Sequence, residues 1–191
     1  MEVKRYLEIL HTFEKLKHVT RHCYMQGGRQ ESVAEHSHRL AVMAYFVKDE
    51  FPKVDIDKVI KMCLFHDLGE AFTGDIPAFH KTDEHEKTET KKIDDYLNAL
   101  PEPYQKELED LFQEMRALKT EEAKLYKALD QMEAVIQHNE SDISTWLPLE
   151  YDLQLVYGAE YVAFSPYMTA LKEECNQITK KKIEEAKNEA K

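Results

Sequence analysis

A histidine directly followed by an aspartate inside an apolar run is the feature that most constrains this chain. The run from Leu64 to Glu70 reads Leu-Phe-His-Asp-Leu-Gly-Glu, so the pair is His66-Asp67. An imidazole nitrogen and a carboxylate oxygen are good ligands for a divalent cation. Because adjacent residues of a helix point only about 100° apart, both side chains can reach one ion in a partly buried pocket. The dipeptide alone is weak evidence, so its meaning depends on whether the rest of the chain supplies further ligands.

Composition limits the classes of protein to which the chain can belong. Its 191 residues suit one domain with a real core. With 26 Lys and Arg against 37 Asp and Glu, the net charge of −11 argues against binding to a nucleic-acid polymer. It allows a small anionic ligand, because a metal ion and one arginine can reverse the local field. The odd number of cysteines, three, suits a reducing compartment. Without a membrane-length apolar run or a signal-peptide stretch, we expect a cytoplasmic protein with no membrane partner.

The first half of the chain shows helical periodicity. Apolar residues recur with a spacing of three and four over residues 3–16, which predicts an amphipathic helix. Residues 17–30 have no period and contain Gly27-Gly28, so we expect a loop there. Ser32 and Glu35 form a capping-box pattern that should begin a helix reaching about residue 49. The next helix should open at Pro52, Asp55 or Asp57 and lead into His66-Asp67; because it is apolar on most sides, we expect it to be the central buried helix.

The second half predicts further helices, over about residues 82–100, around Leu108 to Leu118 with an end near Thr120, over about residues 120–138 and 149–157, and from Ser165-Pro166 onward. Five glycines and six prolines leave little turn material for a many-stranded fold. The sequence therefore predicts an all-α, single-domain helical bundle of roughly seven helices. We expect residues 1–191 to form this one domain, with a core at about 17–140 and a C-terminal helical extension at about 149–191.

Four residues of metal-ligand type lie at or inside the predicted helices: His36, His66, Asp67 and Asp130. They would come from three helices, and ligands that face a bundle interior are one way to hold a catalytic cation. Asp130 lies between Leu129 and Met132, and a buried carboxylate needs a cation, a metal or several donors. Spacing alone leaves both alternatives open, a shared metal site and separate structural roles.

Three segments carry a resemblance to a known family. They are Ser32 to Ala44 around His36, His66 to Pro77, and Glu122 to Gln131. In this order they resemble the HD superfamily of metal-dependent phosphohydrolases, and more closely its 5′-deoxynucleotidase branch, over roughly residues 5–140. The resemblance implies an HD-type helical fold and a single divalent metal held by His36, His66, Asp67 and Asp130. The mixed nitrogen and oxygen donors suit Mn²⁺, Co²⁺, Fe²⁺, Ni²⁺ or Zn²⁺, with Mg²⁺ also admitted.

The same resemblance implies roles for four more residues, each of which alone would be taken as structural or solvent-facing. It assigns Glu70 to proton transfer in catalysis. It places Asp75 beside the substrate, as a second proton handler or as an acceptor for a sugar hydroxyl. It makes Arg21 a phosphate clamp, because a guanidinium fork suits phosphate oxygens. The bacterial enzymes follow this arginine with a tryptophan implicated in rejecting ribose, whereas this chain has His22. That departure leaves the selection of deoxyribose open.

The expected function is that of a metal-dependent phosphomonoesterase that hydrolyses deoxynucleoside 5′-monophosphates, and the resemblance also implies a homodimer. Two alternatives remain at this point. One is an HD hydrolase that acts on another phosphate ester, such as a ribonucleotide, a nucleoside triphosphate, a cyclic nucleotide or a sugar phosphate, because fold and metal do not fix the substrate. The other is a non-catalytic helical module with a structural metal.

Overall fold

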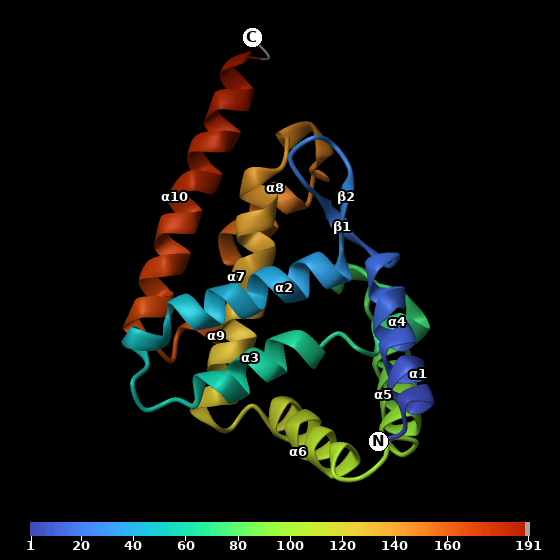
Figure 1. The fold of residues 1–191 in the computed structure, drawn as a ribbon. Coiled ribbons are helices and arrows are strands. Elements are labelled where there is room, and N and C mark those ends of the chain that lie inside the picture. Colours follow the sequence, from blue (N-terminus) through green and yellow to red (C-terminus); the bar gives the residue numbers. More distant parts are fainter. Residues whose placement is uncertain (190–191) are drawn as a thin grey trace.

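The computed structural model describes residues 1–189 and is helical apart from one short hairpin (Figure 1). This confirms the all-α prediction, with eight helices of seven or more residues in the described chain rather than about seven. The long elements are α1 Val3–Glu14, α2 Val33–Phe46, α3 Ile56–Phe65, α5 Asp83–Leu97, α6 Tyr104–Ala117, α7 Glu121–Glu140, α8 Glu150–Val156 and α10 Pro166–Glu189. Two four-residue helices, α4 Glu70–Thr73 and α9 Ala159–Val162, and single 3₁₀ turns at Lys15–Lys17, Lys48–Glu50, Ala78–His80 and Ile143–Thr145 complete the described chain.

Side-chain caps fix where the helices begin. Ser32 accepts a hydrogen bond from the backbone N–H of Glu35, and the Glu35 side chain returns to the Ser32 N–H, which confirms the capping box. Asp55 and Thr120 cap α3 and α7 in the same way, each accepting from the N–H three residues later. The predicted helix starts are correct because these local signals do not depend on tertiary contacts.

The segment predicted as a loop is wrong in one respect, because it contains a β-hairpin. Strands β1 Thr20–Tyr24 and β2 Gln30–Ser32 pair antiparallel, with Thr20 opposite Ser32. Gly27 and Gly28 lie at φ values of 96° and 87°, a conformation that glycine adopts without strain, and they turn the chain between the strands. Each strand is too short to show an alternating apolar pattern, so no strand could be predicted from the residues alone.

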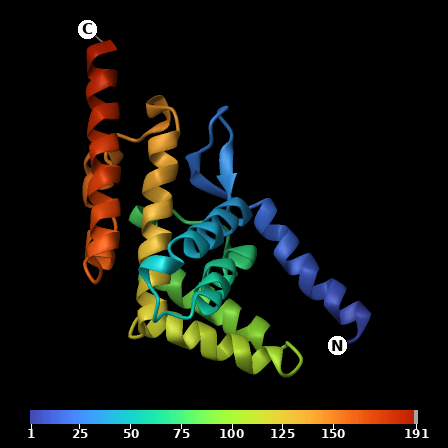
Figure 2. The same ribbon diagram turned by 60° about the vertical axis from the view of Figure 1, so that its left-hand side comes forward.

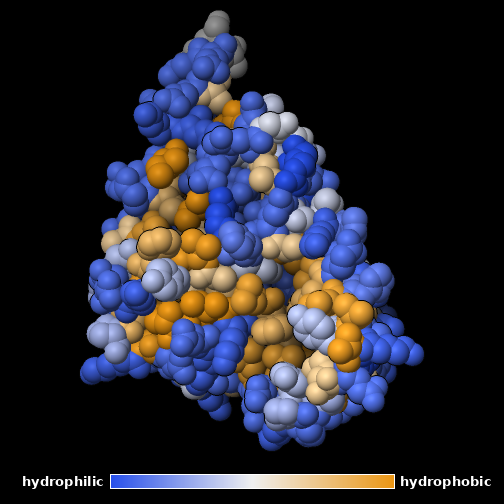
Figure 3. Space-filling model, in the orientation of Figure 1, coloured by the Kyte–Doolittle hydropathy of each residue, from blue (hydrophilic) through white to orange (hydrophobic). Residues whose placement is uncertain are grey.

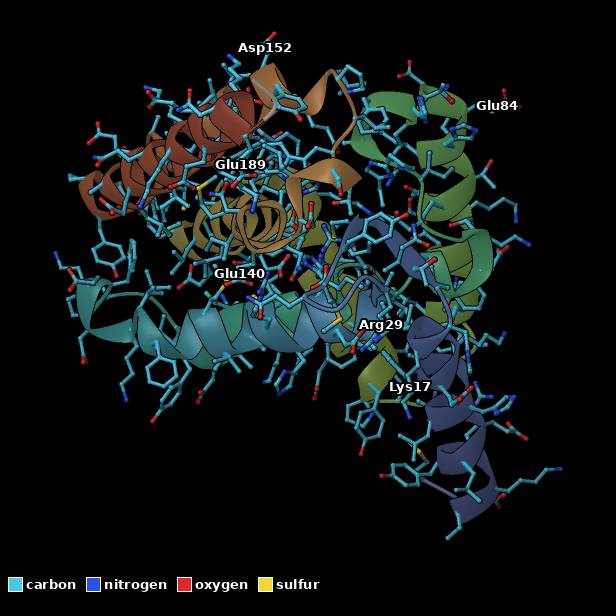
Figure 4. The ribbon with its side chains drawn as sticks, turned by 90° about the horizontal axis from the view of Figure 1, so that it is seen from above. Lys17, Arg29, Glu84, Glu140, Asp152 and Glu189 are labelled. Atoms are coloured by element: carbon cyan, nitrogen blue, oxygen red, sulfur yellow. The ribbon has the colours of Figure 1, made fainter. Side chains whose placement is uncertain are left out.

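Helix α7 is the most enclosed element, although the sequence favoured α3. Eleven residues of α7 are buried against three in α3, and Leu64 of α3 is 42% exposed. Figure 4 shows the reason, with α7 seen end-on between α2 on one side and α10 on the other. Because α7 has neighbours on several sides, it can keep polar residues such as Asp130 and Glu133 inside the fold, where each needs a partner.

Apolar side chains also reach the surface. Helix α1 has no buried residue and projects from the body of the molecule (Figure 2). Val42, Tyr45 and Phe46 on α2 are exposed, and Figure 3 shows apolar surface at the level of α2 and α3. Among the described residues, no helix combines the length and the apolar character needed to cross a membrane.

Candidate metal centre and adjoining pocket

Four side chains from three parts of the fold converge at one point. His36 comes from the first turn of α2, His66 and Asp67 follow the end of α3, and Asp130 lies in the middle of α7. The two imidazole Nε2 atoms are 3.3 Å apart. Oδ1 of Asp130 lies 3.2 Å from Nε2 of His36 and 3.6 Å from Nε2 of His66, and Oδ2 of Asp67 lies 3.0 Å from Nε2 of His66. The structure therefore brings together all four residues that the sequence singled out.

The hydrogen bonds behind the imidazoles determine which nitrogen faces this point. Nδ1 of His66 lies 2.9 Å from the carbonyl oxygen of Cys63, which can only accept, so Nδ1 carries the proton. Nδ1 of His36 donates to the carboxylate of Glu133 in the same way. Both Nε2 lone pairs then point at the carboxylates of Asp67 and Asp130, and two imidazole nitrogens this close to two carboxylates require a positive charge between them. This donor set fits a divalent cation.

The raised pKa of His66 also indicates that a positive charge is favoured at this point. Burial alone would lower its pKa, but the Asp67 carboxylate and a hydrogen bond with Asp130 raise the pKa of His66 to about 10. In the absence of a cation, a proton would supply the charge that the two carboxylates need. A metal that binds here therefore displaces a proton.

Glu133 supports the centre from behind, and the sequence reasoning missed it. It is fully buried, and besides His36 it accepts hydrogen bonds from Arg39 Nε at 2.7 Å and Arg21 Nη1 at 3.3 Å. Although burial opposes ionisation, the nearby His36 keeps the pKa of Glu133 below its usual range. The available signal was a carboxylate between apolar residues of α7, three positions after Asp130.

Glu31, His36 and Glu133 form a second group whose ligand atoms all lie within 4.8 Å of one another. Arg21 Nη1 contacts both carboxylates, 3.7 Å from Glu31 and 3.3 Å from Glu133. These contacts keep the pKa of Arg21 above its usual range in spite of burial. The arginine therefore already supplies the positive charge that this acidic pair requires.

Lys127 fixes the orientation of Asp130. Its Nζ lies 2.8 Å from Oδ2 of Asp130, and Nε2 of Gln131 lies 3.2 Å from the same oxygen. These contacts leave Oδ1 for the two histidines. Burial disfavours the charged amine, yet the Asp130 carboxylate holds the pKa of Lys127 above its usual value. Lys127 is a second residue that the sequence reasoning did not identify.

Glu70 reaches the site by a different route from the one expected. Helix α3 ends at Phe65, a turn follows, and Glu70 is the first residue of the short α4, so it does not lie on a continuing helix. The N–H of Glu70 bonds to the carbonyl of Asp67 at 3.0 Å, which keeps the two residues on the same side of the turn. Burial, followed by the charges of Asp67 and Asp75, raises the pKa of Glu70 to about 10. Its Oε2 is buried without a hydrogen-bond partner among the described residues.

A pocket of about 590 Å³ opens beside the centre. The predicted residues Arg21, His22, Glu70 and Asp75 all line it, together with the two aspartates of the metal centre. Its volume lies within the range of about 300–1,000 Å³ that is usual for sites of small ligands. Six of the eight predicted site residues thus line one pocket, and the other two, His36 and His66, contact its aspartates.

A histidine to which the sequence reasoning gave no role lines the far part of this pocket. Nε2 of His138 lies 3.0 Å from Oε1 of Glu150, and Nε2 of His22 lies 3.3 Å from the same oxygen. Glu150 is only 2% exposed, and although burial opposes ionisation, the hydrogen bond with His138 keeps its pKa low. The three residues come from β1, α7 and α8, so no spacing in the sequence connects them.

Comparisons with known proteins agree with this geometry. A family model for the HD domain matches residues 13–172. The 5′-deoxynucleotidase HDDC2 of Homo sapiens is 35% identical over 138 residues, covering 70% of this chain and 67% of that protein. The 5′-deoxynucleotidase YBR242W of Saccharomyces cerevisiae is 30% identical over 139 residues, covering 69% of this chain and 58% of that protein.

A solved structure shares the fold over almost its full length. The predicted metal-dependent phosphohydrolase from Magnetospirillum magnetotacticum superposes with a TM-score of 0.80 at 26% identity, covering 94% of this chain and 93% of that one. Since the HD domain model spans most of the sequence and includes all four converging donors, the chain belongs to the HD domain family.

Proposed function

We propose that the chain is a metal-dependent phosphomonoesterase that hydrolyses deoxynucleoside 5′-monophosphates to deoxynucleoside and phosphate. The observation that carries the proposal is the convergence of two imidazole nitrogens and two carboxylate oxygens at one end of a 590 Å³ pocket. The named relatives at 30–35% identity are 5′-deoxynucleotidases, which supports the substrate class. A structural metal would require neither the pocket nor a buried Glu70 beside it.

In this proposal His36, His66, Asp67 and Asp130 hold one divalent ion. When bound, such an ion supplies Lewis acidity, which withdraws electron density from a phosphoryl oxygen and makes water easier to deprotonate. The donors suit Mn²⁺, Co²⁺, Fe²⁺, Ni²⁺, Zn²⁺ or Mg²⁺, and the choice among them stays a prediction.

The other residues of the pocket bind the phosphate and move protons. Arg21 contacts Glu31 and Glu133 through Nη1, and the proposal assigns the rest of its guanidinium fork to the phosphate oxygens. Burial raises the pKa of Glu70, and the proposal assigns to Glu70 the proton that the 5′-oxygen takes up as its bond to phosphorus breaks. The oxygen of the attacking water forms the new bond to phosphorus, and a proton of that water returns to the Glu70 carboxylate. Asp75, whose pKa burial also raises, lies in the same pocket as a second proton handler or as an acceptor for a sugar hydroxyl.

His22 is the proposed neighbour of the sugar. It lines the pocket next to Arg21, and its Nε2 lies 3.3 Å from Oε1 of Glu150. Because this chain has an imidazole where the bacterial enzymes have an indole, ribonucleotides are the informative comparison with deoxynucleotides. The ratio of the two activities measures how far His22 excludes a 2′-hydroxyl.

The experiment that tests the proposal is phosphate release from metal-stripped protein resupplied with Mn²⁺, Co²⁺, Mg²⁺ or Zn²⁺. The substrates are deoxy- and ribonucleoside 5′-monophosphates, 3′-monophosphates and triphosphates. We expect metal-dependent release from the deoxynucleoside 5′-monophosphates, and no release from them by Asp67→Ala. If the metal-loaded protein released no phosphate from any of these substrates, the proposal would be overturned. Equal activity on ribose substrates would remove only the preference for deoxyribose.

Removal of the metal separates an enzyme from a module with a structural ion. Because a large apolar core surrounds α7 independently of the four donors, we expect the metal-free protein to stay folded but inactive. Circular dichroism with and without a chelator measures this. The homodimer, which sedimentation would test, the cytoplasmic location and the single-domain organisation of residues 1–191 stay predictions.

A further inference from the structure

The pocket extends along one face of α7 away from the metal centre. Asp130, Ala134 and His138 all line it, and each lies one helical turn from the next. Eight residues of α-helix rise about 12 Å. The pocket is therefore long enough for a nucleoside 5′-monophosphate that has its phosphate at Asp130, which would place the base near His138.

The lining of the pocket is mixed, with apolar and aromatic side chains among its polar groups. Pro77 and Phe79, from the segment after α4, line the pocket, as do Leu153 in α8 and Tyr157 directly after α8. Ligand pockets of this kind bury flat rings against apolar and aromatic side chains, and a few polar groups fix the orientation of the ring.

The polar side chains at this end differ in how many partners they have. His138 is saturated, because Nδ1 donates to the carbonyl of Ala134 at 2.9 Å and Nε2 pairs with Glu150 at 3.0 Å. Glu150 is also engaged through its second oxygen, which accepts from the N–H of Leu147 at 2.7 Å. These residues shape the wall but have little capacity left for a ligand.

Gln154 has that capacity. It is 4% exposed, it lines the pocket, and its side-chain oxygen has no hydrogen-bond partner among the described residues. Its backbone is held in place, because Lys172 Nζ donates to the Gln154 carbonyl at 2.6 Å. A buried amide oxygen without a partner is unfavourable, and a turn of the side chain toward the pocket would let an N–H group of a ligand satisfy it.

We infer that the far end of the pocket is a nucleobase subsite in which the amide of Gln154 hydrogen-bonds the edge of the base. This inference rests on the proposed function and deepens it, because it excludes a simple sugar phosphate as the preferred substrate. An amide presents a donor and an acceptor side by side, and a turn of 180° exchanges them. It therefore matches any base edge with an adjoining donor and acceptor, so a base is required while adenine, cytosine, guanine and thymine are all accepted.

The test compares Gln154→Met with the wild-type holoenzyme. Met keeps the length of the side chain and lacks the amide, and the backbone contact with Lys172 is unaffected. We expect kcat/KM for dAMP, dCMP and dTMP to fall about 10-fold, the value of one ordinary hydrogen bond. The value for 2-deoxyribose 5-phosphate, which has no base, should stay unchanged. The control is Gln177→Met, at an exposed position of α10.

A second variant gives a directional result. In Gln154→Glu the side chain can only accept, so it suits the exocyclic amines of dAMP and dCMP and opposes the two carbonyls of dTMP. We expect the ratio of dCMP to dTMP hydrolysis to rise about 10-fold. An unchanged ratio, or a Gln154→Met variant that loses activity equally on 2-deoxyribose 5-phosphate, would overturn the inference.

Nucleoside binding tests the nucleobase subsite independently of turnover. Titration calorimetry of metal-loaded protein with deoxyadenosine and thymidine should show affinity for wild-type protein and about 10-fold weaker binding to Gln154→Met. If no nucleotide releases phosphate, the proposed function fails, and this titration still tests the subsite. Equal affinities for both proteins, or no nucleoside binding to wild-type protein, would refute it.

Discussion

His36 and Glu133 are both fully enclosed in the core, and they meet through Nδ1 of the imidazole and one carboxylate oxygen. This contact turns the opposite nitrogen of His36 toward Asp130, 3.2 Å away. Glu133 in turn is held by Arg39, which also contacts Glu140 near the surface. The orientation of His36, a proposed metal ligand, is thus set by a residue that is not among the four proposed ligands.

Replacement of Glu133 by Gln should weaken metal binding without removing any donor. The amide cannot hold the His36 proton as a carboxylate does, and loss of such a partner lowers metal affinity by about 10- to 100-fold. Competition with a fluorescent chelator measures this. Glu140→Gln, which changes the outer partner of Arg39 only, is the matched control, and equal affinities for the two variants would contradict the assigned role.

Glu70→Gln should separate chemistry from metal binding. Because Glu70 is a proton handler in the proposed function and not a donor to the ion, we expect full metal content and a fall in kcat of about 10²- to 10⁴-fold. Elemental analysis and steady-state kinetics give the two values. The control is Glu84→Gln on the exposed side of α5. A variant that kept wild-type turnover would remove Glu70 from the mechanism.

Gly158→Ala should destabilise the wall of the pocket. A Cβ at Gly158 would lie 2.7 Å from Cβ of Gln131 and 2.8 Å from Cε of Met132, and the residue has a φ of +74°. We expect the free energy of unfolding to fall by about 2–4 kcal/mol. Gly28→Ala has a similar φ, +87°, but open space around it, so it should cost only about 1 kcal/mol. Urea denaturation checks both, and similar losses would mean that the close contact with α7 is unimportant.

Lys172 should make stability depend on pH in the alkaline range. Burial lowers its pKa from 10.5 to about 8. Between these values the unfolded chain binds more protons than the folded one, so the contribution of Lys172 to the free energy of unfolding rises with pH. After allowance for partial solvent screening, we expect wild-type protein to gain about 1–3 kcal/mol relative to Lys172→Met from pH 8 to 10.5.

Denaturation at a series of pH values measures this difference. Lys180→Met, on the exposed surface of α10, should show no such trend relative to wild-type protein. A difference between wild-type protein and Lys172→Met that stays constant over the whole range would show that Lys172 titrates at its ordinary pKa.

Local signals account for the parts of the fold that the sequence predicted well. Caps such as Ser32 and Thr120 act within one helical turn, so they can be recognised in the sequence without knowledge of the tertiary structure. The hairpin depends on Gly27-Gly28 and on packing of β1 against α7, where Gln137 donates to the Tyr24 carbonyl at 2.6 Å. That contact joins residues 113 positions apart, and no periodicity reports it.

The residues of the candidate site also fall into a group that the sequence predicted and a group that it did not. His36, His66, Asp67 and Asp130 lie in recognisable motifs, and the structure brings them together. The partners that orient them or shape the pocket, such as Glu133 and Glu150, were not predicted, because a buried carboxylate looks the same in sequence whatever it contacts. Even Glu70 reaches the pocket through a turn, whereas helical periodicity suggested a continuing helix.

The pocket also depends on helix α10, which contributes none of the four proposed metal ligands. Lys172 and Asn176 donate to the carbonyls of Gln154 and Leu155, at 2.6 Å and 3.0 Å, and so satisfy the last turn of α8. Proteolytic cleavage and removal of α10 would leave all four proposed metal ligands in place but would remove the support of one pocket wall. A fragment cut there should still take up metal, yet discriminate poorly among the molecules that enter.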